Sequence, residues 1–390
     1  MEPRTRAYLR GRFRDHYRRV APSVPPAANE REWGFIPWSE GSTTMVRHRS
    51  MLDLGDLGDF LARKRPRHVY FSAGRYRDPG AGTMSEKGWR EADLVFDLDA
   101  DHLPRVDPEE DSYAEMLATC KDALVRLIEF LEADFGFEDL SIVFSGGRGY
   151  HVHVRDEDVR TLGREARREI VDYVRGVGVD FDRVVESEPV AGMGRETPAH
   201  KRSLSTTGGW SHRVHRRVET LVDELLAMDE ADALERLRSF EGIGEGRADA
   251  ILTALSNNRA AIDAGNIDVH PAFIGLVRAL VEETVEREMA PIDEPVTTDV
   301  NRLIRLPGSL HGGTGLVVTP IDREELDAFD PLVDAVPSTF REQDIAVSVT
   351  DPGPVAIGGE TFTLSAGARH IPEYLGVFLM ARGRAEKEKE

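Results

Sequence analysis

The stretch Asp93–His102 constrains the fold more than any other part of the chain, because it joins an apolar run to a group of acids. The apolar residues 94–96 are expected to form a buried strand. Asp97 and Asp99 follow on the same strand, where residues two apart share a face and lie about 6–7 Å from each other. Two carboxylates on one face repel each other unless a cation lies between them. The pattern predicts an oxygen-bound Mg²⁺ or Mn²⁺ suited to phosphoryl transfer, with an acidic surface loop as the alternative.

The composition limits the class of protein. A chain of 390 residues can hold one large domain or two ordinary ones. Its formal net charge is −20, and because only six residues are lysine, nearly all the positive charge is arginine. Many acids with few lysines are typical of a surface adapted to high salt inside the cell, and such a surface does not exclude a polyanionic ligand.

Cysteine content and hydropathy exclude several other classes. Cys120 is the single cysteine, which excludes a disulfide framework and a cysteine-rich zinc module. Residues 1–20 are rich in arginine and do not resemble a signal peptide, and no apolar stretch is long enough to span a membrane. We therefore expect a soluble, cytoplasmic protein with no membrane partner.

Hydrophobic periodicity and turn residues predict most of the remaining elements. Helices are expected over residues 1–20, 52–64, 112–135, 156–177 and most of 218–287, and strands over 68–71, 140–144, 150–154 and 314–319. Ser112 is a suitable N-cap for the helix at 112–135, with Glu115 three residues on as in a capping box. A hairpin is expected to pair residues 31–35 with 44–48 around Gly41-Ser42, while residues 180–214 look irregular and the charged tail 382–390 disordered. Gly242–Ala248 resembles the turn of a helix-hairpin-helix, which can hold a DNA phosphate, but a plain tight turn is the favoured interpretation.

A glycine-rich turn follows the strand at 140–144, with the sequence SGGRGYHVH over residues 145–153. Glycines let the backbone approach a ligand closely and point its amides at anions. Arg148 offers a forked donor for phosphate, Ser145 a hydroxyl and His151 an imidazole. Taken alone, the motif could equally be a hairpin turn with one exposed arginine.

A third polar motif spans residues 292–311. It contains the acids Asp293, Glu294 and Asp299, the bases Arg302 and Arg305, and a histidine at position 311. Together the three motifs supply acids for metal ions and Arg and His donors for a triphosphate. This set is what nucleotidyl transfer requires, because a hydroxyl attacks an α-phosphate while metals stabilise the attacking and leaving oxygens.

The same three motifs carry a family resemblance. The segments DLVFDLDADH, SGGRGYHVHV and IDEPVTTDVNRLIRLPGSLHGGTG resemble, in order and spacing, the motifs of the archaeal and eukaryotic DNA primase small (catalytic) subunit. Weaker agreement extends the resemblance to roughly residues 30–340, and the acidic, lysine-poor composition resembles a haloarchaeal member. The resemblance implies an α/β (α+β) fold, with a primase-type catalytic core in which helices flank a small mixed sheet. It further implies a core of residues 1–214 and 288–345, a mostly helical insertion at 215–287 and a C-terminal segment at 346–390.

The resemblance also implies a role for each matching residue. Asp97, Asp99 and Asp293 match the acids that bind two Mg²⁺ or Mn²⁺ ions, with Asp299 as the rival of Asp293. A triphosphate-binding set is implied at five further positions, namely Ser145, Arg148, His151, Arg305 and His311. Arg31-Glu32 and Arg47 resemble positions that flank the active site. The implied activity is template-directed synthesis of short RNA or DNA primers from NTPs or dNTPs on single-stranded DNA, in a heterodimer with a primase large subunit.

One departure from the family concerns zinc. Its members usually carry a Cys/His zinc knuckle after the first motif, whereas the interval Asp101–Asp122 holds only His102 and Cys120. Two candidates cannot complete a four-coordinate structural site, so no zinc is expected there. Cys120 is expected to be a small buried residue.

Two other functions stay open at the level of the sequence. A related primase-polymerase of end-joining repair would share the metal chemistry. A nucleotide- or DNA-binding regulator with a degenerate site would not need to keep repelling carboxylates together.

Overall fold

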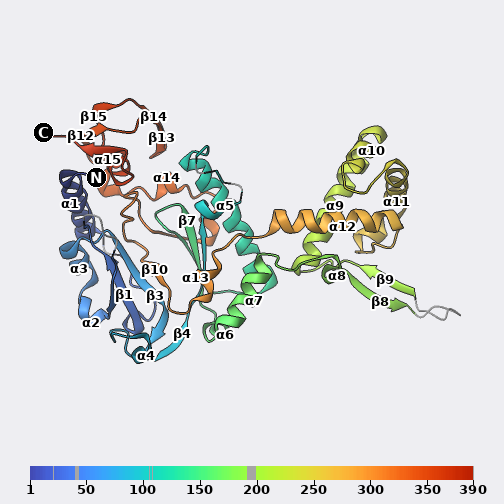
Figure 1. Cartoon of the computed structure of the whole chain (residues 1–390), viewed down its shortest axis with the longest axis horizontal. Coiled ribbons are helices and arrows are strands. Elements are labelled where there is room, and N and C mark those ends of the chain that lie inside the picture. Colours follow the sequence, from blue (N-terminus) through green and yellow to red (C-terminus); the bar gives the residue numbers. More distant parts are fainter. Residues whose placement is uncertain (21, 40–43, 105, 108, 191–198, 390) are drawn as a thin grey trace. The chain divides into compact units, whose positions relative to one another are not determined.

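The computed structural model describes residues 1–20, 22–39, 44–104, 106–107, 109–190 and 199–389. The chain forms two compact units (Figure 1). The first unit comprises Met1–Leu124, Phe137–Val171 and Pro291–Glu390, and the second comprises Val125–Gly136 and Asp172–Ala290. The helical region expected at 215–287 falls inside the second unit.

A four-stranded sheet at the centre of the first unit carries the first two motifs. Its strand order is β11-β6-β7-β5, and all its pairings are antiparallel. The strands are β5 (Leu94–Asp99), β6 (Leu140–Phe144), β7 (Gly149–Val154) and β11 (Thr319–Ile321). The predicted strands at 94–99, 140–144 and 150–154 are confirmed. The strand expected at 314–319 begins only at Thr319, because the preceding residues form the turn that carries Thr314.

A second sheet holds the N-terminal hairpin and has the strand order β10-β3-β1-β2, with β4 also paired to β3. Its strands are β1 (Arg31–Ile36), β2 (Val46–Arg49), β3 (His68–Tyr76), β4 (Trp89–Ala92) and β10 (Leu303–Arg305). The predicted hairpin of β1 and β2 is confirmed, while its turn at Gly41-Ser42 lies outside the described residues. The described strand pairings are all antiparallel, so the α+β class is confirmed but the sheet is not a mixed one.

Several predicted helices are interrupted where a residue leaves helical geometry. The helix expected at 52–64 is two helices, because Gly55 adopts a positive φ of 72° and Asp56 caps the second. The predicted capping box is confirmed, since the Ser112 amide donates to Glu115 at 2.8 Å and the Glu115 amide to the Ser112 hydroxyl at 3.3 Å. The described α-helices that begin between residues 51 and 170 or between residues 290 and 334 are α2 (Met51–Leu54), α3 (Leu57–Lys64), α4 (Met84–Lys87), α5 (Tyr113–Glu129, followed by the π-helix Phe130–Asp134), α6 (Glu157–Arg160), α7 (Arg164–Val174), α13 (Glu294–Thr298) and α14 (Pro331–Asp334).

A buried ion cluster fixes the start of β5 against the second sheet. Arg31 Nη2 donates to both oxygens of the Asp93 carboxylate, each at 2.9 Å, and Arg31 also donates to two backbone carbonyls of β3. Arg155 Nε lies 3.1 Å and His153 Nδ1 3.6 Å from the same carboxylate. Because Arg31 and Asp93 are fully buried, the two charges depend on each other.

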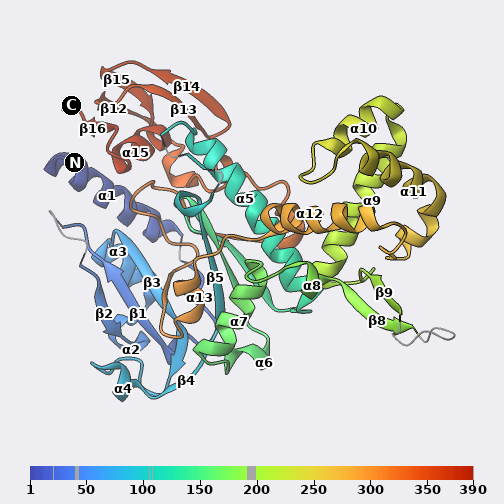
Figure 2. The ribbon, with the colours of Figure 1, turned by 45° about the vertical axis from the view of Figure 1, so that its right-hand side comes forward.

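The C-terminal segment folds against the N-terminal helix. Its elements are β12 (Asp344–Val349), β13 (Gly353–Ile357), β14 (Glu360–Leu364), β15 (Gly367–Pro372), α15 (Glu373–Ala381) and β16 (Ala385–Lys387). The prediction of a disordered tail is wrong for residues 382–389, because β16 pairs with β12 and the Lys387 amide donates to Thr5 of α1 (Pro3–Arg19) at 2.8 Å. The two ends of the chain therefore lie side by side (Figure 2).

The second unit is mostly helical and has its own apolar core, to which five of its described helices contribute. Its elements are α8 (Phe181–Val184), β8 (Glu186–Val190), β9 (Ala199–Ser203), α9 (Gly209–Ala227), α10 (Glu230–Arg238), α11 (Glu245–Asp263) and α12 (Pro271–Glu288). The expectation of irregular chain at 180–214 is wrong, since β8 and β9 form a hairpin. Residues 239–244 connect α10 to α11, and residues 245–248 form the first turn of α11. Among the described helices of the chain, none is long and apolar enough to cross a membrane.

Candidate active site

One cavity of about 490 Å³ in the first unit brings the three sequence motifs together. Five of the eight predicted site residues line it, namely Asp97, Asp99, His151, Asp293 and Arg305. They come from β5, β7, the residue before α13 and β10. Residues separated by up to 208 positions in the sequence thus face one space, which a surface loop of acids would not produce.

Asp97 is held by its neighbour across the sheet. The register of β5 and β7 places Asp97 opposite His151, and His151 Nε2 lies 3.1 Å from the carboxylate. Burial acts to raise the pKa of Asp97. The opposing effects of His151, Arg305 and Arg302 are together larger, so the pKa lies below its ordinary value. Asp97 is therefore a carboxylate at neutral pH and faces the cavity as an anion.

Asp293 meets the same strand from the other side of the cavity. Its amide donates to the Asp97 carbonyl at 2.9 Å, which fixes the start of α13 against β5. Burial raises the pKa of Asp293, and the negative charges of Asp97 and Asp99 raise it further. Its rival Asp299 also lines the cavity, but one of its oxygens accepts the Asn301 amide at 2.9 Å. Both Asp293 and Asp299 thus face the cavity of Asp97 and Asp99, and the charges of Asp97 and Asp99 act on Asp293.

The donor chemistry fits a hard divalent cation. Asp97, Asp99 and Asp293 offer carboxylate oxygens, the ligands that Mg²⁺ and Mn²⁺ prefer. Over the described part of the chain, however, no three His, Cys, Asp or Glu side chains already stand at ligand distance from one common point. The acids are gathered in one cavity without being preset as a coordination shell, which is consistent with the unrelieved repulsion on Asp293.

Cys120 takes no part in this cavity. It is fully buried on α5, where its Sγ lies 3.7 Å from the Leu98 carbonyl, and burial raises the pKa of its thiol. The expectation of a small buried residue is confirmed. The absence of zinc stays a prediction.

The glycine-rich turn between β6 and β7 carries a second group of predicted residues. Gly146 has a φ of 73°, and a Cβ there would come within 2.7 Å of His311 Cβ, so the close approach of His311 requires a glycine. The buried Ser145 hydroxyl accepts the Gly147 amide at 3.3 Å. Arg148 is partly exposed and forms an ion pair with Asp101. The turn thus brings a hydroxyl and a guanidinium together, while its Ser145 and Gly147 amides are bonded within the turn.

His311 lies against this turn as a neutral imidazole. Its Nδ1 is 3.1 Å from the Thr314 hydroxyl, which in turn donates to the Gly146 carbonyl at 2.5 Å. The His68 ring packs edge-on against it, with 4.7 Å between ring centroids. Burial lowers the pKa of His311 well below its ordinary value, and the nearby positive charge of Arg305 lowers it further. Ser145, Arg148 and His311 do not line the cavity of the acids, but Arg305 faces both groups.

The structure adds residues that sequence reasoning missed. Tyr70 and Met45 line the cavity, and the Arg305 guanidinium lies 5.9 Å from the Tyr70 ring. The one sequence signal for Tyr70 was its position on a predicted strand. Among the flanking positions, Arg47 lines the cavity and is held by the buried Glu32 at 3.1 Å. Arg31 instead belongs to the buried cluster with Asp93.

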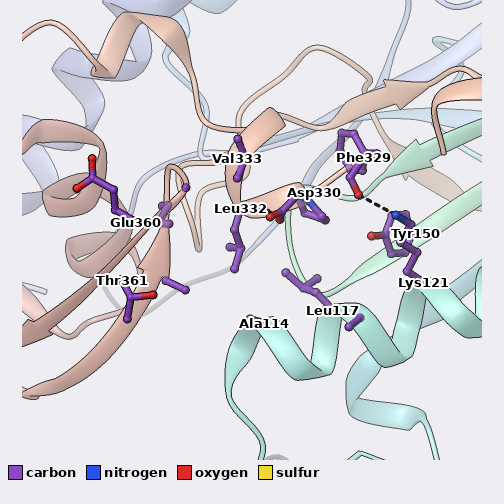
Figure 3. Close-up of a pocket in the computed structure, with 15 residues that line it drawn as sticks. Ala114, Leu117, Lys121, Tyr150, Phe329, Asp330, Leu332, Val333, Glu360 and Thr361 are labelled. Carbon is purple, nitrogen blue, oxygen red and sulfur yellow. Dashed lines mark hydrogen bonds between the residues drawn. The ribbon is translucent and has the colours of Figure 1, made fainter. Parts of the chain in front are cut away.

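A further cavity of about 430 Å³ lies between α5, α14 and the β13–β14 hairpin (Figure 3). Its walls are largely apolar, with Leu117 and Leu332 facing each other across the space. Lys121 Nζ is occupied at its rim, donating to the carbonyls of Asp327 at 2.8 Å and Phe329 at 2.9 Å. None of the site residues predicted from the sequence lines this cavity, so the polar one is the candidate active site.

Comparison with known proteins agrees with this arrangement. The family described as DNA primase small subunit matches residues 96–323, which include Asp97, Asp99, the glycine-rich turn and the third motif. The DNA primase small subunit PriS of Haloarcula marismortui is 68% identical over the whole of both chains. Those of Natronomonas pharaonis and Methanothrix thermoacetophila are 63% and 43% identical, with at least 99% of each chain covered. The chain belongs to the DNA primase small subunit family.

Proposed function

We propose that this protein synthesises short primers for DNA replication by template-directed nucleotidyl transfer on single-stranded DNA. The observation that carries the proposal is the convergence of all three motifs on one cavity, where Asp97, Asp99 and Asp293 face His151 and Arg305. Membership of the DNA primase small subunit family supports it. NTPs or dNTPs would be the substrates.

Asp97, Asp99 and Asp293 would hold two Mg²⁺ or Mn²⁺ ions. When bound, such ions stabilise the attacking and leaving oxygens of the reaction. The depressed pKa of Asp97 keeps one ligand ionised before any cation arrives. The raised pKa of Asp293, caused by burial and by the charges of Asp97 and Asp99, supports the proposal, because a bound cation would relieve that repulsion.

The cationic and neutral donors would orient the triphosphate. Arg305 and Arg148 supply guanidinium donors, the first in the cavity and the second on the glycine-rich turn. Ser145 and the neutral His311 supply uncharged donors beside them, and His151 completes the set. In the reaction the primer 3′-oxygen bonds to the α-phosphorus, the hydroxyl proton passes to water and the bond to the bridging oxygen breaks, releasing pyrophosphate.

A primase large subunit is the proposed partner, as a heterodimer. Copurification and mass measurement of the two coexpressed chains test this assembly. A small subunit that elutes alone at its monomer mass would contradict it.

The test of the activity is primer synthesis on unprimed single-stranded DNA in molar KCl with Mg²⁺ or Mn²⁺, with labelled nucleotides, for the chain alone and with the large subunit. We expect new products from the wild type and none from Asp97→Ala. Asp59→Ala is the matched control, because it removes an exposed carboxylate from α3 of the same unit. Extension restricted to annealed primers would favour a repair polymerase, and metal-independent nucleotide binding without turnover would favour a regulator.

A further inference from the structure

Beside the cavity of the candidate active site lies a second one, of about 550 Å³, which is distinct from the apolar cavity next to α5. The two cavities share Asp299, Asn301 and Arg302 in their walls. Beyond these shared residues the second cavity is lined by Trp89 of β4 and by Arg164 at the start of α7. No residue of the proposed metal- or triphosphate-binding sets lines it.

Strand register places this second cavity at the opposite end of the site from Arg305 and His311, two of the proposed triphosphate donors. Arg305 pairs with Tyr70 on β3, and His68, two residues before Tyr70, contacts His311. Trp89 pairs with Tyr76, six residues further along β3, which corresponds to about 20 Å along a strand. Asn301 bridges the interval, because it accepts a hydrogen bond from the Tyr76 hydroxyl at 3.0 Å.

The second cavity offers the chemistry that a nucleotide of a strand requires. Trp89 is half-buried with its indole nitrogen out of reach of solvent, so the exposed part of the side chain is aromatic carbon on which a base can stack. Arg164 is exposed, and no described residue forms a hydrogen bond or ion pair with it. Arg302 adds a second positive charge. The carboxylate of Asp299 opposes them, but it accepts the Asn301 amide.

Nucleotidyl transfer needs the attacking hydroxyl and the leaving pyrophosphate in line, on opposite sides of the α-phosphorus. Triphosphate donors at the Tyr70 end therefore require the attacking strand to enter from the Tyr76 end. We propose that the cavity of Trp89 and Arg164 binds the 3′-terminal nucleotides of the primer, with Trp89 stacking on a base and Arg164 contacting a phosphate. This inference rests on the proposed function and adds the path of the primer to it.

Steady-state extension of an annealed primer tests the inference. Trp89→Ala and Arg164→Glu are expected to raise the KM for primer–template about tenfold and to leave the KM for the nucleotide within about twofold. Trp89→Phe keeps a ring and should recover most of the loss. Arg63→Glu, on an exposed position of α3, is the matched charge control and should change neither constant. Because Arg164 begins a helix, glutamate there suits the helix dipole and the variant is expected to fold.

A binding measurement separates failure of this inference from failure of the proposed function, because it needs no turnover. Trp33, Trp38 and Trp210 are buried, so Trp89 is the tryptophan that a bound base can quench. A primer–template duplex should quench the intrinsic fluorescence of the whole chain, and Trp89→Phe should remove that response. An unprimed template should reach half-maximal quenching of Trp89 only at a concentration at least tenfold higher than the duplex does.

Three results would overturn the inference. One is an unchanged KM for primer–template in both Trp89→Ala and Arg164→Glu. Another is quenching by duplex that survives in Trp89→Phe. The third is equal quenching by unprimed template, which would assign the cavity to the template strand. Loss of synthesis in every assay with retained quenching by duplex would instead reject the proposed function and leave the strand-binding site standing.

Discussion

The two ends of β5 use the same residue type for different purposes. Asp93 precedes the strand and is fully buried, with Arg31, Arg155 and His153 around its carboxylate. Asp97 and Asp99 end the strand and face a cavity that they share with Asp293. Burial alone would raise the pKa of Asp93, but its neighbours hold that pKa far below the ordinary value, whereas the pKa of Asp293 is raised. The charge of Asp93 is fully enclosed by its partners and stabilises the fold, whereas the acids at the other end keep an open side toward the cavity where a cation could bind.

The largest expected effect is on activity at the cavity end of β5. Asp97→Asn and Asp99→Asn should each lower primer synthesis by ~10³-fold or more, because each removes a charged ligand from the proposed cation site. The free energy of unfolding should change by less than about 1 kcal/mol, because these side chains are partly solvated. Initial rates and urea unfolding at constant KCl measure the two quantities. A large loss of stability with retained activity would show that Asp97 and Asp99 stabilise the fold and do not serve the reaction.

The next largest effect is on stability at the buried end. Asp93→Asn should lower the free energy of unfolding by about 3–5 kcal/mol, because it leaves the Arg31 guanidinium buried without its counter-charge. Urea titration at constant KCl measures the change, with Asp59→Asn as an exposed control. The activity per folded molecule should stay within a few-fold of wild type. A stability equal to wild type would show that the cluster does not hold β5.

The two ends should also respond to pH with opposite signs. The folded pKa of Asp93 is depressed, so its stabilising contribution is present at neutral pH and lost as pH falls below the ordinary carboxyl pKa of about 3.9. The folded pKa of Asp293 is raised, so its charge destabilises the fold at neutral pH, and this cost disappears as pH falls through the folded pKa.

Unfolding measured from pH 7 to pH 4 in EDTA compares the two acids. Asp293→Asn should be more stable than wild type at pH 7, by less than about 1 kcal/mol after solvent screening, and this advantage should shrink as pH falls toward 4. Asp93→Asn should be less stable than wild type throughout this range. An advantage of Asp293→Asn that grows toward acid would contradict the assigned sign.

A small effect on stability, with none on activity, is expected behind β5. Cys120→Ala should lower the free energy of unfolding by about 1 kcal/mol, because it leaves a small void beside Leu98. Primer synthesis should be unchanged, and metal analysis should find less than one zinc per chain in both proteins. One zinc per chain in the wild type that is lost in Cys120→Ala would contradict the expected absence of a zinc site.

The sequence predicted those parts of the fold that depend on local pattern. The strands around Phe96, Ile142 and Val152 are apolar runs bounded by polar residues or glycine, and the capping box at Ser112 is a contact between neighbours in sequence. The tail was predicted wrongly, because the partner that orders Lys387 is β12, about forty residues away. A charged composition says nothing about such a pairing.

The residues of the candidate site also fall into those that local sequence pattern predicts and those that it does not. The spacing of Asp97 and Asp99 and the glycines at 146–149 could be recognised from the sequence alone. The place of Trp89 beside Arg302 could not, because it depends on the antiparallel register of three segments far apart in the chain. For the same reason, sequence patterns could not separate Asp93 from Asp97, which differ in their surroundings and not in their motif.

The contact between the chain ends has a practical consequence. The terminal ammonium lies 3.3 Å from Glu386, and the Lys387 amide donates to Thr5, so residues at the two ends hold each other in place. A short flexible bridge could join these ends, which makes the chain a good subject for circular permutation, with new ends opened in an exposed connection. A purification tag fused directly to either end would start beside these contacts, so a spacer of several residues is needed to leave β16 in its sheet.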